Sequence, residues 1–215
     1  LFQGVLWMLL PLNLIFQPLA SVILTFLLQD DINMYQRQIE LLERSRRDAK
    51  TSLANSQNFD EHLARTLADP SQHPVSVLFL DLDHFKKVND LHGHDMGDRV
   101  LRELSTRLLT SVSPSDKVAR YGGEEFTICL PQCDFGRALS IADRIRIAVE
   151  AEPFCTEVVA RGIHLTISIG VACGEDISAE QLLRRADKAM YAAKNTGRNR
   201  VIGYTMLTGD VASGR

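Results

Sequence analysis

The stretch Val75-Ser-Val-Leu-Phe-Leu-Asp81 decides the fold, because it is a mostly apolar run of strand length. A strand that is apolar at nearly every position has no face to offer to water, so this pattern predicts a strand buried on both sides. Other layers must then cover both faces of the sheet that contains it. We therefore expect a central strand in a mixed domain.

Apolar periodicity on either side of this strand predicts the other elements of an α/β (α+β) domain. Helical spacing is found over residues 55–67, 97–112, 135–149 and 179–195. Strand patterns are found over residues 117–120, 125–130, 164–173 and 201–204. Gly122-Gly123 is typical of a hairpin, and Ser178 with Gln181 forms a capping box before the last helix. The order predicts a central, mostly antiparallel sheet flanked by helices.

The overall composition excludes several classes of protein. The chain has 215 residues, of which 45% are hydrophobic and 24% charged, so a disordered chain is excluded. A net charge of −3 gives no generally basic surface, so we expect no nucleic-acid partner. The four cysteines (Cys129, Cys133, Cys155, Cys173) form no CxxC pair, which favours small buried residues in a reduced compartment over a zinc site.

The first 29 residues differ from the rest, because the first charged residue is Asp30. Residues 5–28 are long and apolar enough to span a bilayer, so we expect residues 1–29 to be a transmembrane helix kinked at Pro11 and Pro18. Basic residues follow it, which places the C-terminal part in the cytoplasm at the inner membrane. A buried helix of a soluble domain, or a fragment of one, is the alternative.

Residues 30–54 carry a short heptad pattern. Its positions are Ile32, Tyr35, Ile39, Leu42, Arg46, Ala49 and Leu53. The pattern predicts a long signalling helix that pairs with a second copy as a parallel coiled coil, and so a homodimer. The alternative is an amphipathic helix that lies on its own domain. The globular domain is expected over residues 55–206, followed by a tail over residues 207–215.

Acidic residues gather at two predicted strand ends. Asp81 and Asp83 end the buried strand, and Glu124 and Glu125 follow the glycines of the hairpin. Two such clusters on neighbouring strands could hold a pair of Mg²⁺ ions, which prefer hard oxygen ligands. Each carboxylate taken alone is more often a solvated loop charge. The absence of a Cβ at a glycine also allows a nucleotide to approach the backbone.

The heptapeptide Arg120-Tyr-Gly-Gly-Glu-Glu-Phe126 resembles the signature of the GGDEF family, the diguanylate cyclases, in its GGEEF form. Further motifs resemble the family in the same order, so that the similarity covers residues 48–204. They are Leu80–Asp90, Gly93–Asp98, Thr166–Gly170, Arg185–Lys194 and Gly197–Asn199. The resemblance implies the nucleotidyl cyclase/polymerase palm fold.

The resemblance implies roles for particular residues. Asp81 and Glu124 would bind two Mg²⁺ ions, with Mn²⁺ as an alternative, and Leu82 would add its carbonyl oxygen. Glu125 would assist a metal, help to deprotonate the attacking hydroxyl, or fix the hairpin. The substrate-binding set implied by the family is Gly122, Gly123, Asn89 and Asp98 for the nucleoside, and Phe85, Lys86, Lys194 and Arg198 for the phosphates. Basic residues at a helix C-terminus can also simply complement the helix dipole.

The chain departs from the family pattern in two places. In the opening motif Lys50 stands in place of a leucine, Ser52 of a glycine and Ser56 of an arginine. These substitutions affect the expected joint between the signalling helix and the domain more than they affect the expected catalytic residues. In the inhibitory product site, Ser113 stands in place of an arginine while Asp116 remains, and Arg144 is the candidate for a compensating cation.

These observations predict a membrane-tethered diguanylate cyclase. Two GTP would be condensed to cyclic di-GMP and two pyrophosphates, with one GTP bound by each domain of a dimer. A degenerate module that only binds GTP or cyclic di-GMP is the first alternative, although such modules usually lose acids or glycines of the signature. A cyclase with a mononucleotide product is the second.

Overall fold

The computed structural model describes residues 28–29, 32–37 and 46–205. The chain divides into two compact units, residues 1–45 and residues 46–215. The described part of the first unit is helical, with Ile32 and Tyr35 exposed. Almost all of the expected transmembrane segment and the heptad positions Ile39 and Leu42 lie outside the described residues. Within the described ranges, no helix is both long and apolar enough to cross a membrane.

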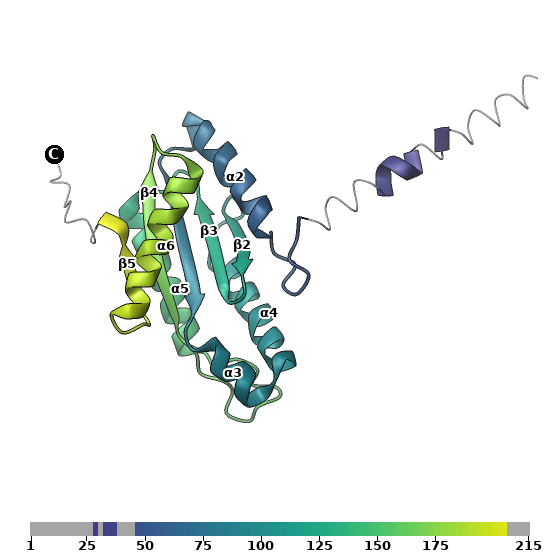
Figure 1. Ribbon diagram of the computed structural model, residues 1–215, viewed down its shortest axis with the longest axis vertical. Helices are drawn as coiled ribbons and strands as arrows, with labels where there is room; N and C mark the ends of the chain where they lie inside the picture. The colour runs from purple at the N-terminus through teal and green to yellow at the C-terminus, as the bar shows by residue number, and fades with distance from the viewer. Residues whose placement is uncertain (1–27, 30–31, 38–45, 206–215) are drawn as a thin grey trace, which may run out of the picture. The chain divides into compact units, whose positions relative to one another are not determined.

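The second unit alternates helices and strands around one sheet (Figure 1). Its elements are α2 (Ser56–Ala68), the 3₁₀ helix η1 (Pro70–Gln72), β1 (Val75–Leu82), α3 (Phe85–His92), α4 (His94–Thr110), β2 (Lys117–Gly122), β3 (Glu125–Leu130), α5 (Phe135–Ala151), β4 (Ile167–Gly174), α6 (Ala179–Asn195) and β5 (Val201–Gly203). The strand order is β2-β3-β1-β4-β5. Only the β4–β5 pair among these strands is parallel, so the predicted mostly antiparallel sheet is confirmed.

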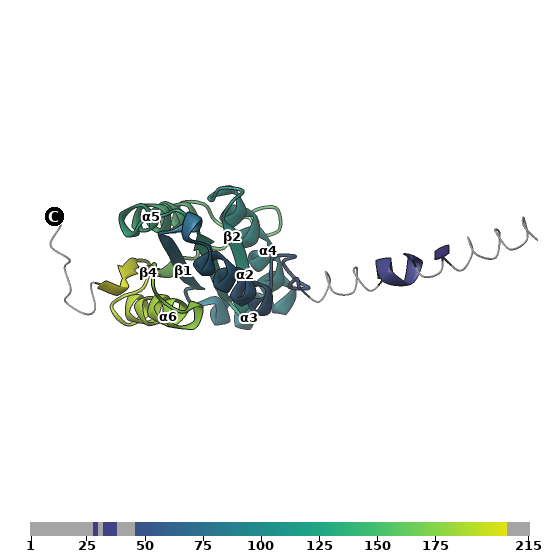
Figure 2. The ribbon, with the colours of Figure 1, turned by 90° about the horizontal axis from the view of Figure 1, so that it is seen from above.

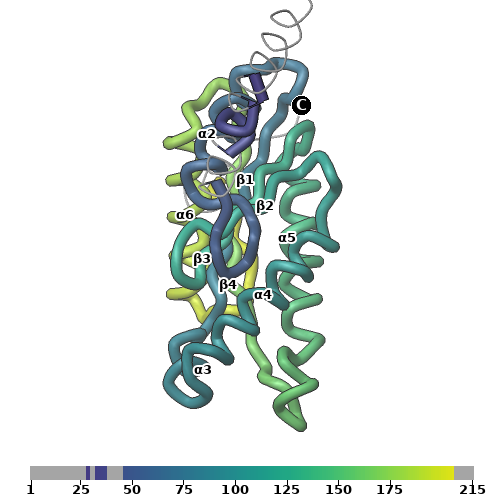
Figure 3. Tube along the Cα trace, turned by 90° about the vertical axis from the view of Figure 1, so that its right-hand side faces the viewer, coloured from purple at the N-terminus to yellow at the C-terminus, as the bar shows by residue number. Residues whose placement is uncertain are grey.

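Strand β1 lies at the centre of the sheet, and every one of its residues is buried. Its alternate side chains enter two cores, because successive residues of a strand point to opposite faces. Leu78 and Leu80 belong to the core shared with α4 and α5, whereas Val77 and Phe79 belong to the core shared with α2 and α6. Figures 2 and 3 show α5 and α6 on opposite sides of the strands. Asp81 is two residues beyond Phe79 in β1, so its side chain lies on the same face of the sheet as those of Val77 and Phe79, toward α6.

Side chains cap three of the helices at their first turns. The Asn55 side chain accepts a hydrogen bond from the amide of Asn58 (3.0 Å), and Ser178 Oγ accepts one from the amide of Gln181 (3.2 Å). The side chain of Asp134 caps α5 in the same way. Such caps satisfy amide groups that have no partner within the helix. The predicted start of the last helix after Ser178 is therefore confirmed.

The prediction of a helix through residue 54 is wrong for residues 46–54, which form turns and an isolated bridge. Asp48 Oδ1 accepts hydrogen bonds from the amides of Lys50 and Thr51, and Ser52 has a φ of 62°. These bonds offer the backbone an alternative to a helix. Leu53, expected on the coiled-coil seam, is instead buried in the domain core.

The cysteines are free thiols, and three of them, Cys129, Cys133 and Cys155, are buried. Burial raises the pKa of Cys129 to about 12 and that of Cys133 to about 11. A thiol with so high a pKa is protonated and unreactive at neutral pH. These residues therefore behave as the small buried side chains that the sequence predicts.

Candidate active site

Asp81 lies at the end of β1 with 2% of its surface exposed, and its carboxylate faces the end of α6. Its Oδ2 atom is 2.6 Å from Nζ of Lys194, whose side chain is 26% exposed. Its Oδ1 atom is buried and has no hydrogen-bond partner. Burial of a carboxylate oxygen without a partner is costly. Asp81 thus retains one oxygen that is free to bind a further cation.

The turn between β2 and β3 lies beside the end of β1. Asp81 is paired with Glu125 in the β1–β3 register, and the amide of Leu82 donates to the carbonyl of Glu124 (3.3 Å). Gly122 and Gly123 have φ values outside the left-handed region, so the turn itself does not require glycine. A Cβ at Gly123 would meet no atom within 4 Å, so the space beside it is open. This space fits the predicted approach of a ligand.

The three predicted catalytic carboxylates influence one another. Burial raises the pKa of Asp81, although the nearby Lys194 opposes this effect. Burial raises the pKa values of Glu124 and Glu125 as well, and the charge of Asp81 raises both further. Like charges in a partly buried site disfavour ionisation unless a cation balances them. The cluster is therefore short of positive charge.

The donors at this site fit a Mg²⁺ ion. Asp81 offers an unpartnered oxygen, Glu124 is the second carboxylate, and the amide of Leu82, the residue after Asp81, bonds to the carbonyl of Glu124. No three His, Cys, Asp or Glu side chains converge on one point within the described part of the chain. Mg²⁺ is typically held by one or two carboxylates together with substrate phosphates and water. A pair of carboxylates is thus sufficient.

Asp83, the other acid at the end of β1, is used within the fold. Its carboxylate accepts hydrogen bonds from Ser168 Oγ (2.7 Å), Thr166 Oγ1 (2.7 Å) and the amide of Asn199 (3.0 Å). A buried carboxylate with three donors already has its charge stabilised. Asp83 therefore joins β1 to β4 and to the loop after α6, whereas Asp81 of the same acidic cluster keeps an unpartnered oxygen.

The residues expected to bind phosphate come from the start of α3, which follows β1, and from the end of α6 and the loop after it. Phe85 begins α3 with its side chain buried, whereas Lys86 is exposed. The first amides of a helix attract anions, which suits the expected role of the Phe85 backbone. At the end of α6, Lys194 contacts Asp81, and the charge of Arg198 acts on the same carboxylate. Two cationic groups, Lys194 and Arg198, therefore act on the carboxylate at the strand end.

Asn89 and Asp98, the predicted guanine-binding pair, are brought together by Gly97. A Cβ at this position would lie 2.0 Å from Asn89 Oδ1 and 3.0 Å from the Phe85 ring, so only glycine allows α3 and α4 to approach this closely. The carboxylate of Asp98 is 2.7 Å from Nζ of Lys50. The sequence did not predict this contact, since Lys50 was noted only as a departure from the family pattern.

Arg120 links the hairpin to the loop that precedes α2. Its guanidinium contacts both carboxylate oxygens of Asp48 (3.0 and 3.1 Å) and donates two bonds to the carbonyl of Gly123 (2.6 and 3.0 Å). Hydrogen bonds to Thr51 and Arg120 lower the pKa of Asp48 against the effect of its burial. The Arg120 side chain is 10% exposed, so this is a largely buried ion pair that fixes the turn next to Glu124.

In the region of the predicted inhibitory site, Asp116 and Arg144 are engaged in local hydrogen bonds. Asp116 Oδ2 accepts from the amide of Ser113 (2.7 Å), and Arg144 donates to the carbonyl of Ser111 (2.7 Å). A cavity of about 110 Å³ at Ser113 and Asp116 is lined by Arg137. Sequence reasoning named Arg144 as the candidate cation and missed Arg137, which lies in the first turn of α5.

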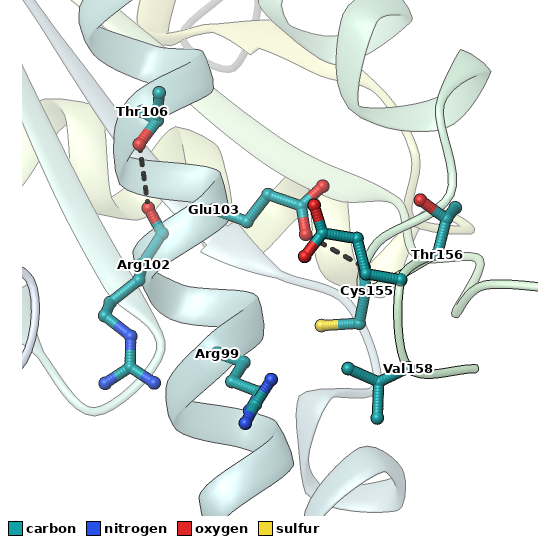
Figure 4. Close-up of a pocket in the computed structure, with 8 residues that line it drawn as sticks. Arg99, Arg102, Glu103, Thr106, Cys155, Thr156 and Val158 are labelled. Atoms are coloured by element: carbon teal, nitrogen blue, oxygen red, sulfur yellow. Dashed lines mark hydrogen bonds between the residues drawn. The ribbon is translucent and has the colours of Figure 1, made fainter.

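A larger cavity, of about 550 Å³, lies between α4 and the loop after α5 (Figure 4). Arg99, Arg102 and Glu103 line it from the helix. The carboxylate of Glu103 accepts from the amide of Cys155 (2.8 Å) and from Arg107 (2.6 Å), so it holds the loop against the helix. The cavity contains none of the predicted active-site residues.

Comparison with known proteins agrees with the arrangement of the strand end, the hairpin and the α3–α4 pair. The family model of the GGDEF domain, described as diguanylate cyclase, matches residues 45–200. The chain therefore belongs to the GGDEF family. This family relationship accounts for the signature at the hairpin and for the motifs on α3, α4 and α6.

Individual relatives agree with this assignment. The chain is 48% identical over 132 residues to the response regulator PleD of Caulobacter vibrioides, covering 60% of this chain and 29% of that protein. It is 39% identical over 182 residues to the diguanylate cyclase DgcM of Escherichia coli, covering 80% of this chain and 42% of that protein. The chain thus spans less than half the length of either curated relative.

Solved structures show the same fold. The coiled coil and GGDEF domain of DgcB from Caulobacter crescentus, in complex with c-di-GMP, matches with a TM-score of 0.73 and 31% identity, covering 84% of this chain and 98% of that chain. The active GGEEF domain of a diguanylate cyclase from Vibrio cholerae matches with a TM-score of 0.65 and 32% identity, covering 71% and 97%. The predicted fold class is confirmed.

Proposed function

We propose that this chain condenses two GTP into cyclic di-GMP and two pyrophosphates, with Asp81 and Glu124 as carboxylate ligands of the catalytic Mg²⁺ ions. The observation that carries the proposal is the buried, unpartnered Oδ1 atom of Asp81 beside the Glu124 turn. Two Mg²⁺ ions bound there would lower the pKa of the attacking 3′-hydroxyl and neutralise charge on the reacting phosphates.

The protein's own groups bind and orient the substrate. Asn89 and Asp98 would hold the guanine, since a carboxylate accepts from the ring N–H and the exocyclic amine that adenine does not present together. The first amides of α3, together with Lys86, Lys194 and Arg198, would hold the triphosphate. Gly122 and Gly123 leave room for the nucleotide at the hairpin. With the nucleotide held in this way, its α-phosphate would lie beside Asp81 and Glu124.

The reaction requires two domains. In each half-reaction the 3′-oxygen of one GTP forms a bond to the α-phosphorus of the other, and the bond to pyrophosphate breaks. The hydroxyl proton leaves to a base, for which Glu125, with its raised pKa, is our candidate. Because each domain would bind one GTP, we propose a homodimer. The exposed side chains of Ile32 and Tyr35 support pairing through the heptad segment.

We further propose that the N-terminal segment anchors the protein in the inner membrane with the catalytic domain in the cytoplasm. The support is the uncharged run before Asp30 and the basic residues that follow it. Fractionation of cells that express the full chain tests this directly. Recovery of the protein in the membrane fraction after a salt wash is expected, and recovery in the soluble fraction contradicts the proposal.

The test of the activity is incubation of the purified chain with GTP and Mg²⁺, followed by chromatographic identification of the products. Cyclic di-GMP is expected. Tight nucleotide binding without turnover would instead favour the degenerate signalling module, and a cyclic mononucleotide would favour the second alternative. Retention of Gly122, Gly123, Glu124 and Glu125 argues against the degenerate module.

A further inference from the structure

We propose that Lys50 is a specificity-determining residue that donates a hydrogen bond to O6 of the bound guanine. This inference rests on the proposed function and deepens it, because it concerns the same nucleotide site. It starts from the contact between Lys50 Nζ and Asp98 Oδ1, which are 2.7 Å apart. The position belongs to the opening motif, where the family pattern has a leucine that could not make this bond.

The loop that carries Lys50 is rigidly held. The Asp48 side chain accepts from the amides of Lys50 (3.2 Å) and Thr51 (2.8 Å) and forms the buried ion pair with Arg120. The amide of Asp48 donates to the carbonyl of Leu53 (2.9 Å), and Leu53 is 5% exposed. The backbone at Lys50 is therefore held by the turn of Asp48 and by the core contact of Leu53. Only the lysine side chain must be ordered to reach Asp98.

The two charged groups retain capacity for a ligand. An ammonium group has three N–H donors, of which this contact uses one, and a carboxylate has two acceptor oxygens. The side chains of Lys50 and Asp98 are 50% and 26% exposed, so both are accessible to a nucleotide. The pair therefore presents a donor beside an acceptor at one edge of the site.

This order of donor and acceptor matches guanine. The Watson–Crick edge of guanine carries the O6 acceptor beside the N1–H and 2-amino donors. Asp98 would accept from the donors while Lys50 donates to O6. Adenine carries an amino group in place of O6 and has no hydrogen on N1, so it would leave both protein groups unpaired. Lys50 thus adds to the discrimination that Asn89 and Asp98 supply.

The test compares the binding of three bases to the wild-type full chain and to Lys50→Met. The probes are 3′-deoxy triphosphates of guanine, hypoxanthine and 2-aminopurine, which lack the attacking hydroxyl and cannot be cyclised. Guanine and hypoxanthine carry O6, whereas 2-aminopurine does not. Lys50→Met should weaken binding of the first two by about tenfold and change that of the third by less than about twofold. Lys50→Arg, which keeps N–H donors, should preserve the preference.

Several outcomes are distinguishable. An equal loss for all three bases would mean that Lys50 acts only through its charge, and tighter guanine binding by Lys50→Met would mean that it only competes with the base for Asp98. Either result overturns the inference and leaves the proposed function standing. A wild-type chain that binds none of the three triphosphates would instead overturn the proposed function. Since Lys50 is half-exposed, the variant should fold, and its melting temperature checks this.

Discussion

The ammonium group of Lys194 lies 2.6 Å from Oδ2 of Asp81, while Oδ1 of the same carboxylate has no partner. Lys194 lies in the last turn of α6 and Asp81 is the penultimate residue of β1, so the contact joins the ends of these two elements. The single charge of Lys194 does not balance the three carboxylates of Asp81, Glu124 and Glu125. Burial is the main cause that raises the pKa of each of them. The site is thus arranged to take up more positive charge.

The first prediction concerns Glu124. Glu124→Gln removes a metal ligand while keeping the size of the side chain, so turnover of GTP should fall by more than about a hundredfold. The fold should remain intact, because Glu124 lies in a turn. Steady-state pyrophosphate release measures the effect. Glu180→Gln, at an exposed α6 residue that pairs with Arg184, is the matched control and should keep its activity. Comparable activity in both variants would remove Glu124 from the metal site.

The second prediction is a pH dependence of stabilisation by Mg²⁺. Without metal, an acid whose pKa is raised by folding contributes stability at low pH, and this stability is lost as the pH rises through the raised pKa. Mg²⁺ binds the ionised carboxylates of Asp81 and Glu124, so its stabilising effect should grow over the same range. Melting temperatures with EDTA and with Mg²⁺, from about pH 5 to about pH 8, measure it. A rise in melting temperature on adding Mg²⁺ that is the same at every pH would contradict the assignment of Asp81 and Glu124 as metal ligands.

The third prediction concerns Ser52, which has a φ of 62° where the family pattern has glycine. A non-glycine residue in the left-handed region is strained. Ser52→Gly should therefore raise the free energy of unfolding by about 0.5–1 kcal/mol. Denaturant unfolding measures the change. Ser56→Gly, at the first position of α2, is the control and should bring no gain. Equal gains in both variants would show that strain at position 52 is not the cause.

The fourth prediction is weak inhibition by the product. Ser113 offers no guanidinium, and its amide is already bonded to Asp116. Cyclic di-GMP should therefore bind about tenfold or more weakly than to a relative that has the arginine. Reaction progress should stay linear as product accumulates, and Ser113→Arg should introduce curvature. Calorimetric titration is the direct measurement. Tight binding that survives Asp116→Ala but disappears in variants of Arg137 or Arg144 would show that another cation has taken over.

The fifth prediction concerns assembly. Replacement of Ile39 and Leu42 by lysine should lower specific activity most at low protein concentration, because one GTP per domain makes activity second order in protein when the helices no longer pair. Assays over a range of protein concentrations measure this. Activity that is independent of concentration in this variant would argue against a dimer held by the heptad segment.

The sequence predicted most elements of the domain because β1, α4 and α6 have strong local patterns, but α3 was not among the helices predicted from spacing. It could not predict contacts between residues far apart in the chain. Lys50 and Asp98 are separated by 48 positions, and Asp48 and Arg120 by 72. Only the folded sheet and the α3–α4 pair bring these residues together.

The error over residues 46–54 has a different cause. The heptad pattern continued through Ala49 and Leu53, but the side chain of Asp48 bonds to the amide of Thr51 and closes a turn. Asp followed by a polar residue at this spacing is a turn signal that competes with helical spacing. The hydrogen bonds of Asp83 could not be predicted for the other reason, because its partners Ser168 and Asn199 lie far along the chain.

The most direct test of the account is the stoichiometry of the reaction. Pyrophosphate and nucleotide products are quantified in one incubation of the full chain with GTP and Mg²⁺. Condensation across two half-sites predicts two pyrophosphates for each cyclic di-GMP, with both formed more than about a hundredfold more slowly by Glu124→Gln. One pyrophosphate for each cyclic mononucleotide, or guanine nucleotide binding with no pyrophosphate from the wild type, would contradict the account.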